Sequence, residues 1–403
     1  MGTDLSKKNI ILGVCGGIAA YKSAELLRLL KKAGAEVRVM MTANAQHFVG
    51  PLTFEALSGQ KVCNDLFDLQ ADAAMRHIDW AEQADAVIVA PATANMIGKV
   101  AHGIADDALS TFLLAVTAPV LLCPSMNTNM YASQAVQRNL QILSDDDYTI
   151  ITPESGELAC GTIGPGRLPE PTYIFDRVVR LFCPKDLKGR TVLVTAGPTH
   201  EAIDPVRFIG NPSSGKMGYA VARAAEYRGA QVLLVSGPSC LEAPSNVEVI
   251  RIQSAAEMAR VVFDRLPQAQ IVVKAAAVAD YRPKAPATQK IKKRDAEMAL
   301  ELEKTQDILK EIGHQKGKRF VVGFAAETEA LDQNAAKKLT EKNLDIIAGN
   351  LVGTPASGFQ TDTNQVTLYF RDGTREQLPV MDKEAVAHII LDRVVERLTP
   401  VTG

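Results

Sequence analysis

Residues 10–42 read IILGVCGGIAAYKSAELLRLLKKAGAEVRVMMT, and their pattern indicates the class of fold. Its apolar start, 10–14, has the composition of a buried strand and ends in a Cys-Gly-Gly turn. The following segment spaces its apolar residues as a helix does, and Gly34 ends that helix. Residues 36–42 then supply a second strand. A strand, a helix and another strand in this order predict a parallel β–α–β unit.

The same order of elements continues through the first half of the chain and then restarts. In the first half, further strands are expected at 86–92, 119–126 and 148–153. In the second half, a helix at 215–229 separates two strands, and the expected strands are 191–197, 231–237, 271–281, 320–327 and 344–350. A hairpin turned at Asp372-Gly373 and a helix at 383–398 complete the chain. The sequence therefore predicts an α/β protein of two Rossmann-like domains with mainly parallel sheets, spanning residues 1–189 and 190–403.

The overall composition excludes several classes of protein. Hydrophobic residues make up 47% and charged residues 22%, which is typical of a globular protein, and the net charge of −2 favours no nucleic-acid partner. No apolar run approaches the ~20 residues that cross a bilayer, and the N-terminus lacks the pattern of a secretory signal. The six cysteines and six histidines show neither disulfide-framework nor zinc-site spacing. We expect a reduced, cytoplasmic protein that binds neither membranes nor nucleic acids.

The turns after the first strands differ from those of dinucleotide-binding proteins. Such proteins need G-x-G-x-x-G and an acidic residue about twenty residues later. Gly13, Gly16 and Gly17 have a different spacing, and the second strand ends in Thr42 rather than in a carboxylate. A mononucleotide remains compatible, because backbone N–H groups at one helix N-terminus can bind one phosphate.

Residues 210–216 fit the phosphate-loop pattern G-x-x-x-x-G-K but do not make an ordinary P-loop. A P-loop follows its strand directly and carries Ser or Thr after the lysine to hold Mg²⁺. Here Met217 follows the lysine, and residues 198–210 separate the segment from its strand. The glycines are instead expected to open a helix whose free N–H groups bind phosphate.

Several polar residues of the first half follow predicted strands, where ligands collect in doubly wound folds. Thr93 and Asn95 follow one strand, and Asn127 follows the next. Each of these, taken alone, is better explained as a helix cap. His77 alone fits a structural or surface histidine, and Cys160 alone fits an inert thiol in a glycine-rich stretch too irregular for a simple connector. The combination of these five residues is therefore stronger evidence for a functional site than any one of them.

The motifs occur together in an order that resembles a known family. GGIAAYK, RHIDWA, APATAN, PSMNTNM and ACGTIGPGR in the first half resemble the flavin-dependent phosphopantothenoylcysteine decarboxylases. In the second half, TAGPTHEAIDPVRFIGNPSSGKMG, AAAVADY, QKIKK and VGFAAE resemble phosphopantothenate–cysteine ligase. Fused in this order, the halves are similar to bacterial bifunctional coenzyme A biosynthesis proteins over nearly the whole chain. The resemblance implies an N-terminal flavoprotein domain and a C-terminal ligase domain.

This resemblance implies an enzyme with two activities. The ligase joins 4′-phosphopantothenate to L-cysteine, with CTP as co-substrate, Mg²⁺ as the metal and an acyl-cytidylate as the intermediate. The decarboxylase then converts 4′-phosphopantothenoyl-L-cysteine to 4′-phosphopantetheine, with FMN as the electron acceptor that loss of CO₂ requires.

For the first half, the resemblance assigns three catalytic residues. His77 is the base that assists oxidation of the substrate thiol, Asn127 binds the substrate carboxylate, and Cys160 protonates the enethiol. The residues expected to contact FMN are Gly16, Gly17, Thr42, Ala92, Thr93, Ala94 and Asn95.

For the second half, Asn211 and Lys290 are the implied catalytic residues. Asn211 stabilises the oxyanion formed during attack by cysteine, and Lys290 stabilises the charge that builds during attack by the carboxylate. Asp280 is expected to bind Mg²⁺ or the nucleotide. The other residues expected to bind the nucleotide are Gly197, Ser213, Gly215, Gly218, Lys274, Ala275, Ala276, Thr305, Gln306, Asp307, Ile308, Phe324, Lys338 and Lys342. By spacing alone, Lys338 and Lys342 are equally compatible with a solvated basic face of a helix.

Three positions depart from the family pattern, and two other functions remain open. Pro212 stands in place of an aromatic residue or histidine, Lys274 in place of a neutral residue, and Thr305-Gln306 in place of Asn-Pro. The alternatives are a flavin-binding protein with a degenerate ligase half and a flavin-binding regulatory protein. The resemblance also implies a homo-oligomer, a dodecamer of decarboxylase trimers, with FMN at their interfaces, joined by ligase dimers.

Overall fold

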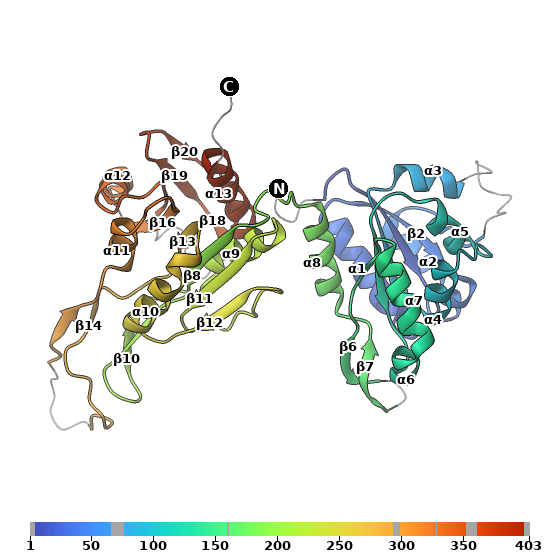
Figure 1. Ribbon diagram of the computed structural model, residues 1–403, viewed down its shortest axis with the longest axis horizontal. Helices are drawn as coiled ribbons and strands as arrows, with labels where there is room; N and C mark the ends of the chain where they lie inside the picture. Colours follow the sequence, from blue (N-terminus) through green and yellow to red (C-terminus); the bar gives the residue numbers. More distant parts are fainter. Residues whose placement is uncertain are drawn as a thin grey trace. The chain divides into compact units, whose positions relative to one another are not determined.

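The computed structural model describes residues 5–65, 76–158, 161–292, 299–327, 329–351 and 361–398. The chain divides into two compact units between Leu181 and Phe182 (Figure 1). Each unit contains a mainly parallel sheet with helices packed on it, which confirms the predicted fold class. None of the helices in the described ranges combines the length and the apolar composition that spanning a membrane requires.

The first unit is built on a parallel sheet of five strands in the order β2–β1–β3–β4–β5. Its central strand β1 comes from the stretch that begins at residue 10, and all but its first residue are buried. The strands are β1 (Asn9–Val14), β2 (Glu36–Met41), β3 (Ala86–Ala92), β4 (Val120–Pro124) and β5 (Thr149–Ile150).

Helices cover this sheet because its strands are apolar on both faces. Helices α4, α5 and α7 pack on one face, in a core that includes Ile11, Val87 and Leu122. Helix α1 contacts β1, β2 and β3. The helices are α1 (Ala20–Lys32), α2 (Pro51–Ser58), α3 (Arg76–Gln83), α4 (Ala94–Ala101), α5 (Ala108–Ala115), α6 (Thr128–Ala132), α7 (Gln134–Asp145) and α8 (Pro171–Phe182), with a 3₁₀ turn η1 (Ala43–His47).

The glycine-rich stretch before α8 forms an antiparallel hairpin of β6 (Glu154–Glu157) and β7 (Ile163–Arg167). This hairpin lies against the turn after β4, where the N–H of Met126 donates to the carbonyl of Gly166 at 3.0 Å. β7 also contacts α6. The stretch is therefore more than a connector, because it covers the carboxyl end of β4.

The second unit is built on a sheet of eight strands in the order β12–β11–β8–β13–β16–β17–β19–β20. The first six strands of that order are parallel, and β19 and β20 are antiparallel to their neighbours. The chain runs outward from β8 to β11 and then returns to β13 on the other side of β8, so the strand order reverses between β8 and β13. The strands are β8 (Thr191–Ala196), β11 (Gln231–Ser236), β12 (Glu248–Arg251), β13 (Ile271–Lys274), β16 (Phe320–Glu327), β17 (Ile346–Leu351), β19 (Val366–Phe370) and β20 (Arg375–Gln377).

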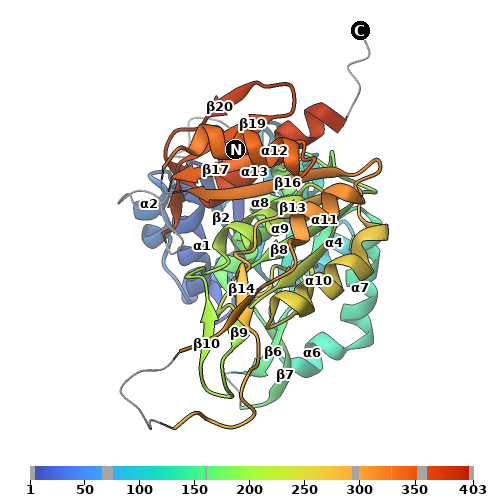
Figure 2. The same ribbon diagram turned by 90° about the vertical axis from the view of Figure 1, so that its left-hand side faces the viewer.

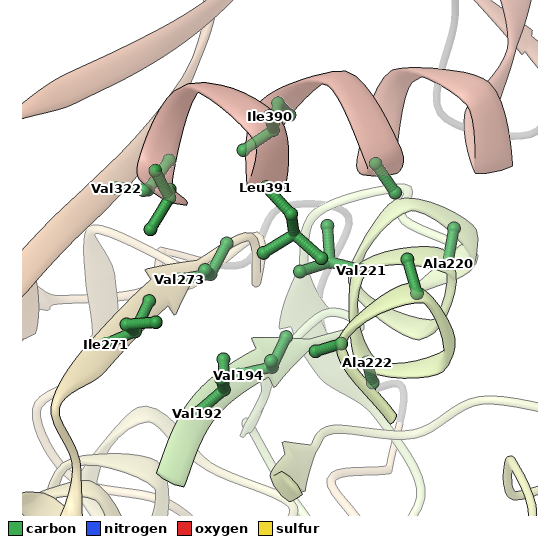
Figure 3. Packing of buried hydrophobic residues seen from close by; sticks show 14 of the residues in the cluster. Val192, Val194, Ala220, Val221, Ala222, Ile271, Val273, Val322, Ile390 and Leu391 are labelled. Atoms are coloured by element: carbon green, nitrogen blue, oxygen red, sulfur yellow. The ribbon is translucent and has the colours of Figure 1, made fainter. Parts of the chain in front are cut away.

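Two helices share one face of this sheet. Val221 of α9 and Leu391 of α13 belong to one buried apolar cluster with Val194 of β8 and Val273 of β13 (Figure 3). Helices α10, α11 and α12 contribute to a second cluster with Leu193 and other residues of the same sheet. The helices are α9 (Lys216–Tyr227), α10 (Ala255–Arg265), α11 (Ile308–His314), α12 (Leu331–Glu341) and α13 (Lys383–Leu398), with a 3₁₀ turn η2 (Leu266–Gln268).

The predicted strand at 271–281 is wrong in its second half. β13 ends at Lys274. The N–H of Ala275 then donates to the carbonyl of Thr195 near the end of β8, and the N–H of Ala277 donates to the carbonyl of Gly197 just beyond β8. The chain leaves the sheet there to form an arm, in which β14 (Tyr281–Pro283) pairs with β15 (Leu302–Lys304). A second hairpin, β9 (His200–Ala202) and β10 (Phe208–Gly210), lies beside β14 (Figure 2). The hairpin at Asp372-Gly373 and the helix at 383–398 are confirmed.

Candidate functional site

A cavity of about 720 Å³ lies at the carboxyl ends of three parallel strands of the first unit. The turns after β1, β3 and β4 and the β6–β7 hairpin form its wall. Five residues predicted to bind FMN or substrate line it: Gly16, Gly17, Thr93, Ala94 and Asn127. Ala92 is buried in β3, and Asn95 is exposed in the first turn of α4. The structure thus brings five of the ten predicted site residues of this half to one cavity.

The turn after β1 requires glycine at residue 16. A Cβ atom there would lie 2.5 Å from the Cβ of Asn44 and 2.7 Å from its backbone carbon, which no side chain permits. A Cβ atom at Gly17 would meet no atom within 4 Å. The turn therefore packs tightly on one side and presents its backbone to open space on the other.

The interpretation of Thr93 and Asn127 as helix caps and their place in the cavity are both correct. The Thr93 hydroxyl accepts from the N–H of Met96 at 3.4 Å, and the Asn127 side-chain oxygen accepts from the N–H of Asn129 at 2.8 Å. Capping fixes these side chains at the starts of α4 and α6. Both residues consequently have defined positions at the cavity wall.

Thr42 does not line this cavity, but its side chain gives an independent sign of a bound group near the glycine turn. Its hydroxyl oxygen is buried and has no hydrogen-bond partner among the described residues. It lies at the end of β2, where its N–H donates to the carbonyl of Val14 at 3.1 Å, close to the glycine turn. Buried hydroxyl groups are nearly always hydrogen-bonded. The residues present therefore fit a bound group with polar atoms, as FMN has in its ribityl chain and phosphate.

Two of the predicted catalytic residues lie outside the described part of the chain. Cys160 falls in the gap of the β6–β7 hairpin, and the side chain of His77 is likewise outside the described residues, although its backbone belongs to α3. Their roles stay predictions. Cys15, directly before the glycine turn, is fully buried, and burial raises its thiol pKa to about 12. That thiol is therefore a poor proton donor at neutral pH.

The second unit has a cavity of about 490 Å³ at the point where the strand order of its sheet reverses. Ligands bind at such reversals in doubly wound folds. Fifteen of the predicted site residues line the cavity: Asn211, Ser213, Gly215, Gly218, Lys274, Ala275, Ala276, Asp280, Thr305, Gln306, Asp307, Ile308, Phe324, Lys338 and Lys342. They come from five separate stretches of sequence, which the sheet brings together.

Gly197 and Lys290 are not part of this cavity wall. Gly197 lies beneath the glycine-rich loop, because a Cβ atom on Gly215 would come within 3.3 Å of its nitrogen. Lys290 is exposed on the arm. The next residue, Ile291, is held there by hydrogen bonds to the side chains of Asp204 and Arg207.

The glycine-rich loop differs from a P-loop in its connection to the sheet. The β9–β10 hairpin lies between β8 and the loop, and α9 begins only at Lys216. Gly215 precedes the helix in the left-handed conformation, with φ of +82°. The prediction that this segment opens a helix is confirmed.

Lys338 and Lys342 are paired with carboxylates at the cavity. Lys338 donates to Glu327 at 2.6 Å, and Lys342, the residue that follows α12, lies 2.8 Å from a carboxylate oxygen of Asp307. Partial burial opposes ionisation of Asp307, but hydrogen bonds from Lys342 and from the N–H of Lys310 lower its pKa below the usual value. These lysines therefore belong to the cavity wall rather than to a freely solvated face.

Lys274 carries a third ammonium group at this wall. Its Nζ atom donates to the carbonyl of Ala276 at 3.0 Å. Burial lowers the pKa of Lys274 to about 8, and the charge of Lys342 contributes in the same direction. Asp307 and Asp280 oppose this shift without cancelling it. The end of β13 thus presents a cation that an anionic ligand would stabilise.

The described residues contain no cluster of three or more His, Cys, Asp or Glu side chains that could hold a metal ion. Asp280 and Asp307 are the carboxylates at the cavity wall. Mg²⁺ usually binds one or two carboxylates together with substrate phosphates and water. The carboxylates present are therefore as many as a Mg²⁺ site needs when other ligands complete it.

Sequence comparison decides the family. Residues 1–183 match the family described as Flavoprotein, and residues 187–398 match the DNA/pantothenate metabolism flavoprotein C-terminal domain. The coenzyme A biosynthesis bifunctional protein CoaBC of Bacillus subtilis (strain 168) is 50% identical over 394 residues, which cover 97% of each chain. The protein of the same name from Escherichia coli (strain K12) is 46% identical over 399 residues, 98% of each chain. The chain belongs to this family.

As a bifunctional coenzyme A biosynthesis protein, the chain is an enzyme with a flavoprotein decarboxylase half and a ligase half. The family predicted from the motifs is confirmed. A crystal structure of the C-terminal domain of CoaBC is also similar, with 43% identity and a TM-score of 0.46, and it covers 53% of this chain and 98% of its own.

The ligase cavity also contains residues that the motifs did not identify. Lys216, Asn350, Asn364 and Lys383 line it in addition to the predicted set. Three of them belong to the last third of the chain, where the sequence offered a hairpin and a helix but no binding motif. Lys216 stood in the GKMG motif without an assigned role.

Proposed function

We propose that this chain makes 4′-phosphopantetheine in two steps, with ligation in residues 190–403 and decarboxylation in residues 1–189. The observation that carries the proposal is the presence of two separate cavities at the carboxyl ends of two parallel sheets. Each is lined by residues of one motif set. A bifunctional enzyme needs such a separation, because the two reactions share no chemistry.

In the first step, the carboxylate of 4′-phosphopantothenate attacks the α-phosphorus of CTP. An acyl–phosphate bond forms, and pyrophosphate leaves. The backbone of the glycine-rich loop binds the phosphates at the start of α9. Phe324, Lys338 and Lys342 hold the cytidine end, and Asp280 holds Mg²⁺ together with the phosphates.

In the second step, the cysteine amine attacks the acyl carbon, and CMP leaves. Asn211 lies at the cavity wall with its amide nitrogen bonded to the carbonyl of Val278 at 3.2 Å. This bond orients the amide, whose other N–H can stabilise the oxyanion. Lys290 does not line this cavity. It stabilises the developing charge only if the arm that carries it moves towards the cavity, or if a second copy of the chain supplies the lysine.

In the decarboxylase half, the chain's residues orient the substrate and move protons. The turn at Gly16-Gly17, Thr42 and the segment 92–95 hold FMN, and FMN when bound supplies the electron acceptor for decarboxylation. Asn127 binds the substrate carboxylate, and the β6–β7 hairpin excludes water from the cavity. His77 accepts the thiol proton, and Cys160 returns a proton to the product carbon.

The test is the full reaction with 4′-phosphopantothenate, L-cysteine, CTP and Mg²⁺, followed by mass spectrometry of quenched samples. Wild type should form 4′-phosphopantetheine, His77→Asn should stop at the ligated product, and Asn211→Asp should accumulate the acyl-cytidylate. Decarboxylation of supplied 4′-phosphopantothenoyl-L-cysteine without ligation would support the alternative with a degenerate ligase half, and no turnover at all would support the flavin-binding regulatory protein.

We further propose a dodecamer of decarboxylase trimers joined by ligase dimers. The first unit has exposed apolar side chains, among them Ile18, Leu52 and Ile163. Such side chains support contacts with other copies of the chain. Analytical ultracentrifugation measures the assembly, and the mass of a monomer in solution would exclude it.

A further inference from the structure

Two lysines from distant parts of the chain lie at one wall of the ligase cavity. Lys216 is the first residue of α9, and Lys383 is the first residue of α13. Both line the cavity beside the glycine-rich loop. Only 7% of the surface of Lys383 is exposed, which is rare for a lysine. Such burial needs a reason, because a buried ammonium group loses its hydration.

The packing of α9 against α13 brings these two helix starts to the same side. Arg223 in α9 pairs with Glu384 at the start of α13, and Arg228 pairs with Asp392 one to two turns further along. The order of these pairs shows that the helices run in the same direction. Figure 3 shows both helices over the same face of the sheet.

A short segment next to the cavity binds both lysine side chains. The carboxylate of Asp362 accepts from Nζ of Lys216 at 2.6 Å, and the carbonyl of Thr361 accepts from Nζ of Lys383 at 2.5 Å. The segment is held in place by pairing of β18 (Thr363–Asn364) with β21 (Met381–Asp382). Pairing between distant segments of the chain therefore brings the two lysines and Asp362 together.

Among the described side chains that interact here, two lysines face one carboxylate, that of Asp362. Burial and the charge of Lys216 lower the pKa of Lys383, while Asp362 raises it only in part. The Asp362 side chain is 87% exposed, and such an exposed ion pair contributes little to folding. An anion with several oxygens would stabilise both ammonium groups better than this single carboxylate does.

The position of the two lysines indicates which part of a nucleotide they would meet. α9 and α13 pack on one face of the sheet, whereas α11 and α12, with Asp307 and Lys338, pack on the other. Residues from both sides line the cavity at the carboxyl ends of the strands, among them Lys216 and Lys338. A nucleotide whose cytidine lies near Lys338, on the side of α11 and α12, therefore directs its phosphates along the glycine-rich loop towards Lys216 and Lys383.

We propose that Lys216 and Lys383 form a subsite for the two terminal phosphates of the nucleotide and hold pyrophosphate as it leaves. This inference rests on the proposed ligase function. When the carboxylate attacks the α-phosphorus, the bond from that phosphorus to the bridging oxygen breaks, and pyrophosphate takes the electron pair. The two ammonium groups neutralise this charge without transferring a proton. In the subsite, phosphate oxygens replace Asp362 as the partner of Lys216.

The test is isothermal titration of the full-length chain with CTP, CMP and inorganic pyrophosphate in the presence of Mg²⁺. Lys383→Met and Lys216→Met should each weaken binding of CTP and pyrophosphate about tenfold or more and leave CMP binding unchanged. Asp362→Asn should tighten pyrophosphate binding, because it removes a competing carboxylate. Lys383→Arg should restore most of the affinity. The matched control is Lys337→Met, which removes an exposed lysine of α12 that lies 3.9 Å from Glu341.

Equal weakening of CTP and CMP, or unchanged affinity for pyrophosphate, would overturn the subsite. If Lys383→Met does not fold, as judged by its thermal unfolding, then Lys216→Met and Asp362→Asn decide the question. Looser or unchanged pyrophosphate binding by Asp362→Asn would also contradict the proposal. If the ligase assignment itself is wrong, the titration gives another result: the wild-type chain binds neither CTP nor CMP.

Discussion

A Cβ atom on Gly218 would lie 2.5 Å from the Cβ of Ala196, closer than two side chains can approach. Gly218 belongs to the first turn of α9, and Ala196 is the last residue of β8. The missing side chain lets the helix start directly against the end of the strand. This contact places the glycine-rich loop at the cavity, so the glycine serves packing as well as access to a ligand.

Replacing Gly218 with Ala should lower the free energy of unfolding of the second unit by about 1–3 kcal/mol, because the added methyl group overpacks the contact. Displacement of α9 should also raise KM for CTP. The control is Gly98→Ala in α4, where the nearest atom to the new Cβ would be 3.6 Å away. That change should be neutral or slightly stabilising, since Ala favours helices. A Gly218→Ala variant with unchanged Tm and KM would contradict the close approach.

Replacing Thr42 with Val should leave the stability of the flavin-free protein unchanged or raise it, because the buried hydroxyl has no described partner to lose. The same change should weaken FMN binding, measured by flavin fluorescence during dissociation. The contrasting control is Thr111→Val, which removes a hydrogen bond of 2.8 Å to the carbonyl of Asp107. That variant should lose stability and keep its affinity for FMN. Unaltered flavin affinity of Thr42→Val would remove Thr42 from the site.

The affinity for CTP should decrease as the pH rises through about 8. The pKa of Lys274 is lowered to about 8, so this side chain is charged below that pH and neutral above it. Lys274→Met should bind CTP more weakly at pH 7 and lack the step near pH 8, whereas Lys337→Met should retain it. Titration calorimetry between pH 6.5 and 9 measures both. Identical pH profiles of wild type and Lys274→Met would exclude this side chain from nucleotide binding.

His388 should destabilise the second unit in acid. Burial first, and then the charge of Arg228, lower its pKa to about 4, although Asp392 and Asp382 oppose the shift. An unfolded histidine titrates near 6.5, so the unfolded chain binds the proton first as the pH falls. The free energy of unfolding should therefore fall by roughly 2–3 kcal/mol between about pH 6.5 and 4 and then level off.

Hydrogen exchange of the α13 amides between pH 7 and 4, corrected for intrinsic exchange rates, measures this loss. His388→Gln should flatten the pH dependence, because its amide does not titrate. His47→Gln, a change of an exposed histidine in the first unit, serves as the control. An equally steep acid response of His388→Gln would assign the loss to other groups.

Local patterns predicted most of the fold. The strands β1, β3 and β16 and the helix α13 were placed within a residue or two, because their apolar periods are long and uninterrupted. The segment 271–281 was misassigned, because its run of alanines is apolar enough for a strand. Its backbone instead bonds to Thr195 and Gly197 at the carboxyl end of the internal strand β8. A contact between residues so far apart in sequence leaves no local pattern.

The predicted sites divide in the same way. Residues in contiguous motifs, such as Asn211 and Asp280, meet at one cavity as expected. Lys290 also belongs to a motif, yet it lies on the arm outside that cavity, because Asp204 and Arg207 hold the neighbouring backbone there. Membership of a motif therefore does not by itself decide which residues meet at one cavity.

The α/β class, the two halves and the family could be read from the sequence alone, because these depend on periodicity and on motifs that local residues carry. That Lys216 and Lys383 line one cavity became visible only in the folded chain. Their meeting depends on the parallel packing of α9 on α13 and on the segment that carries Asp362. A sheet whose strand order differs from the chain order brings distant residues together through backbone pairing and buried apolar contacts. No spacing along the chain encodes that proximity.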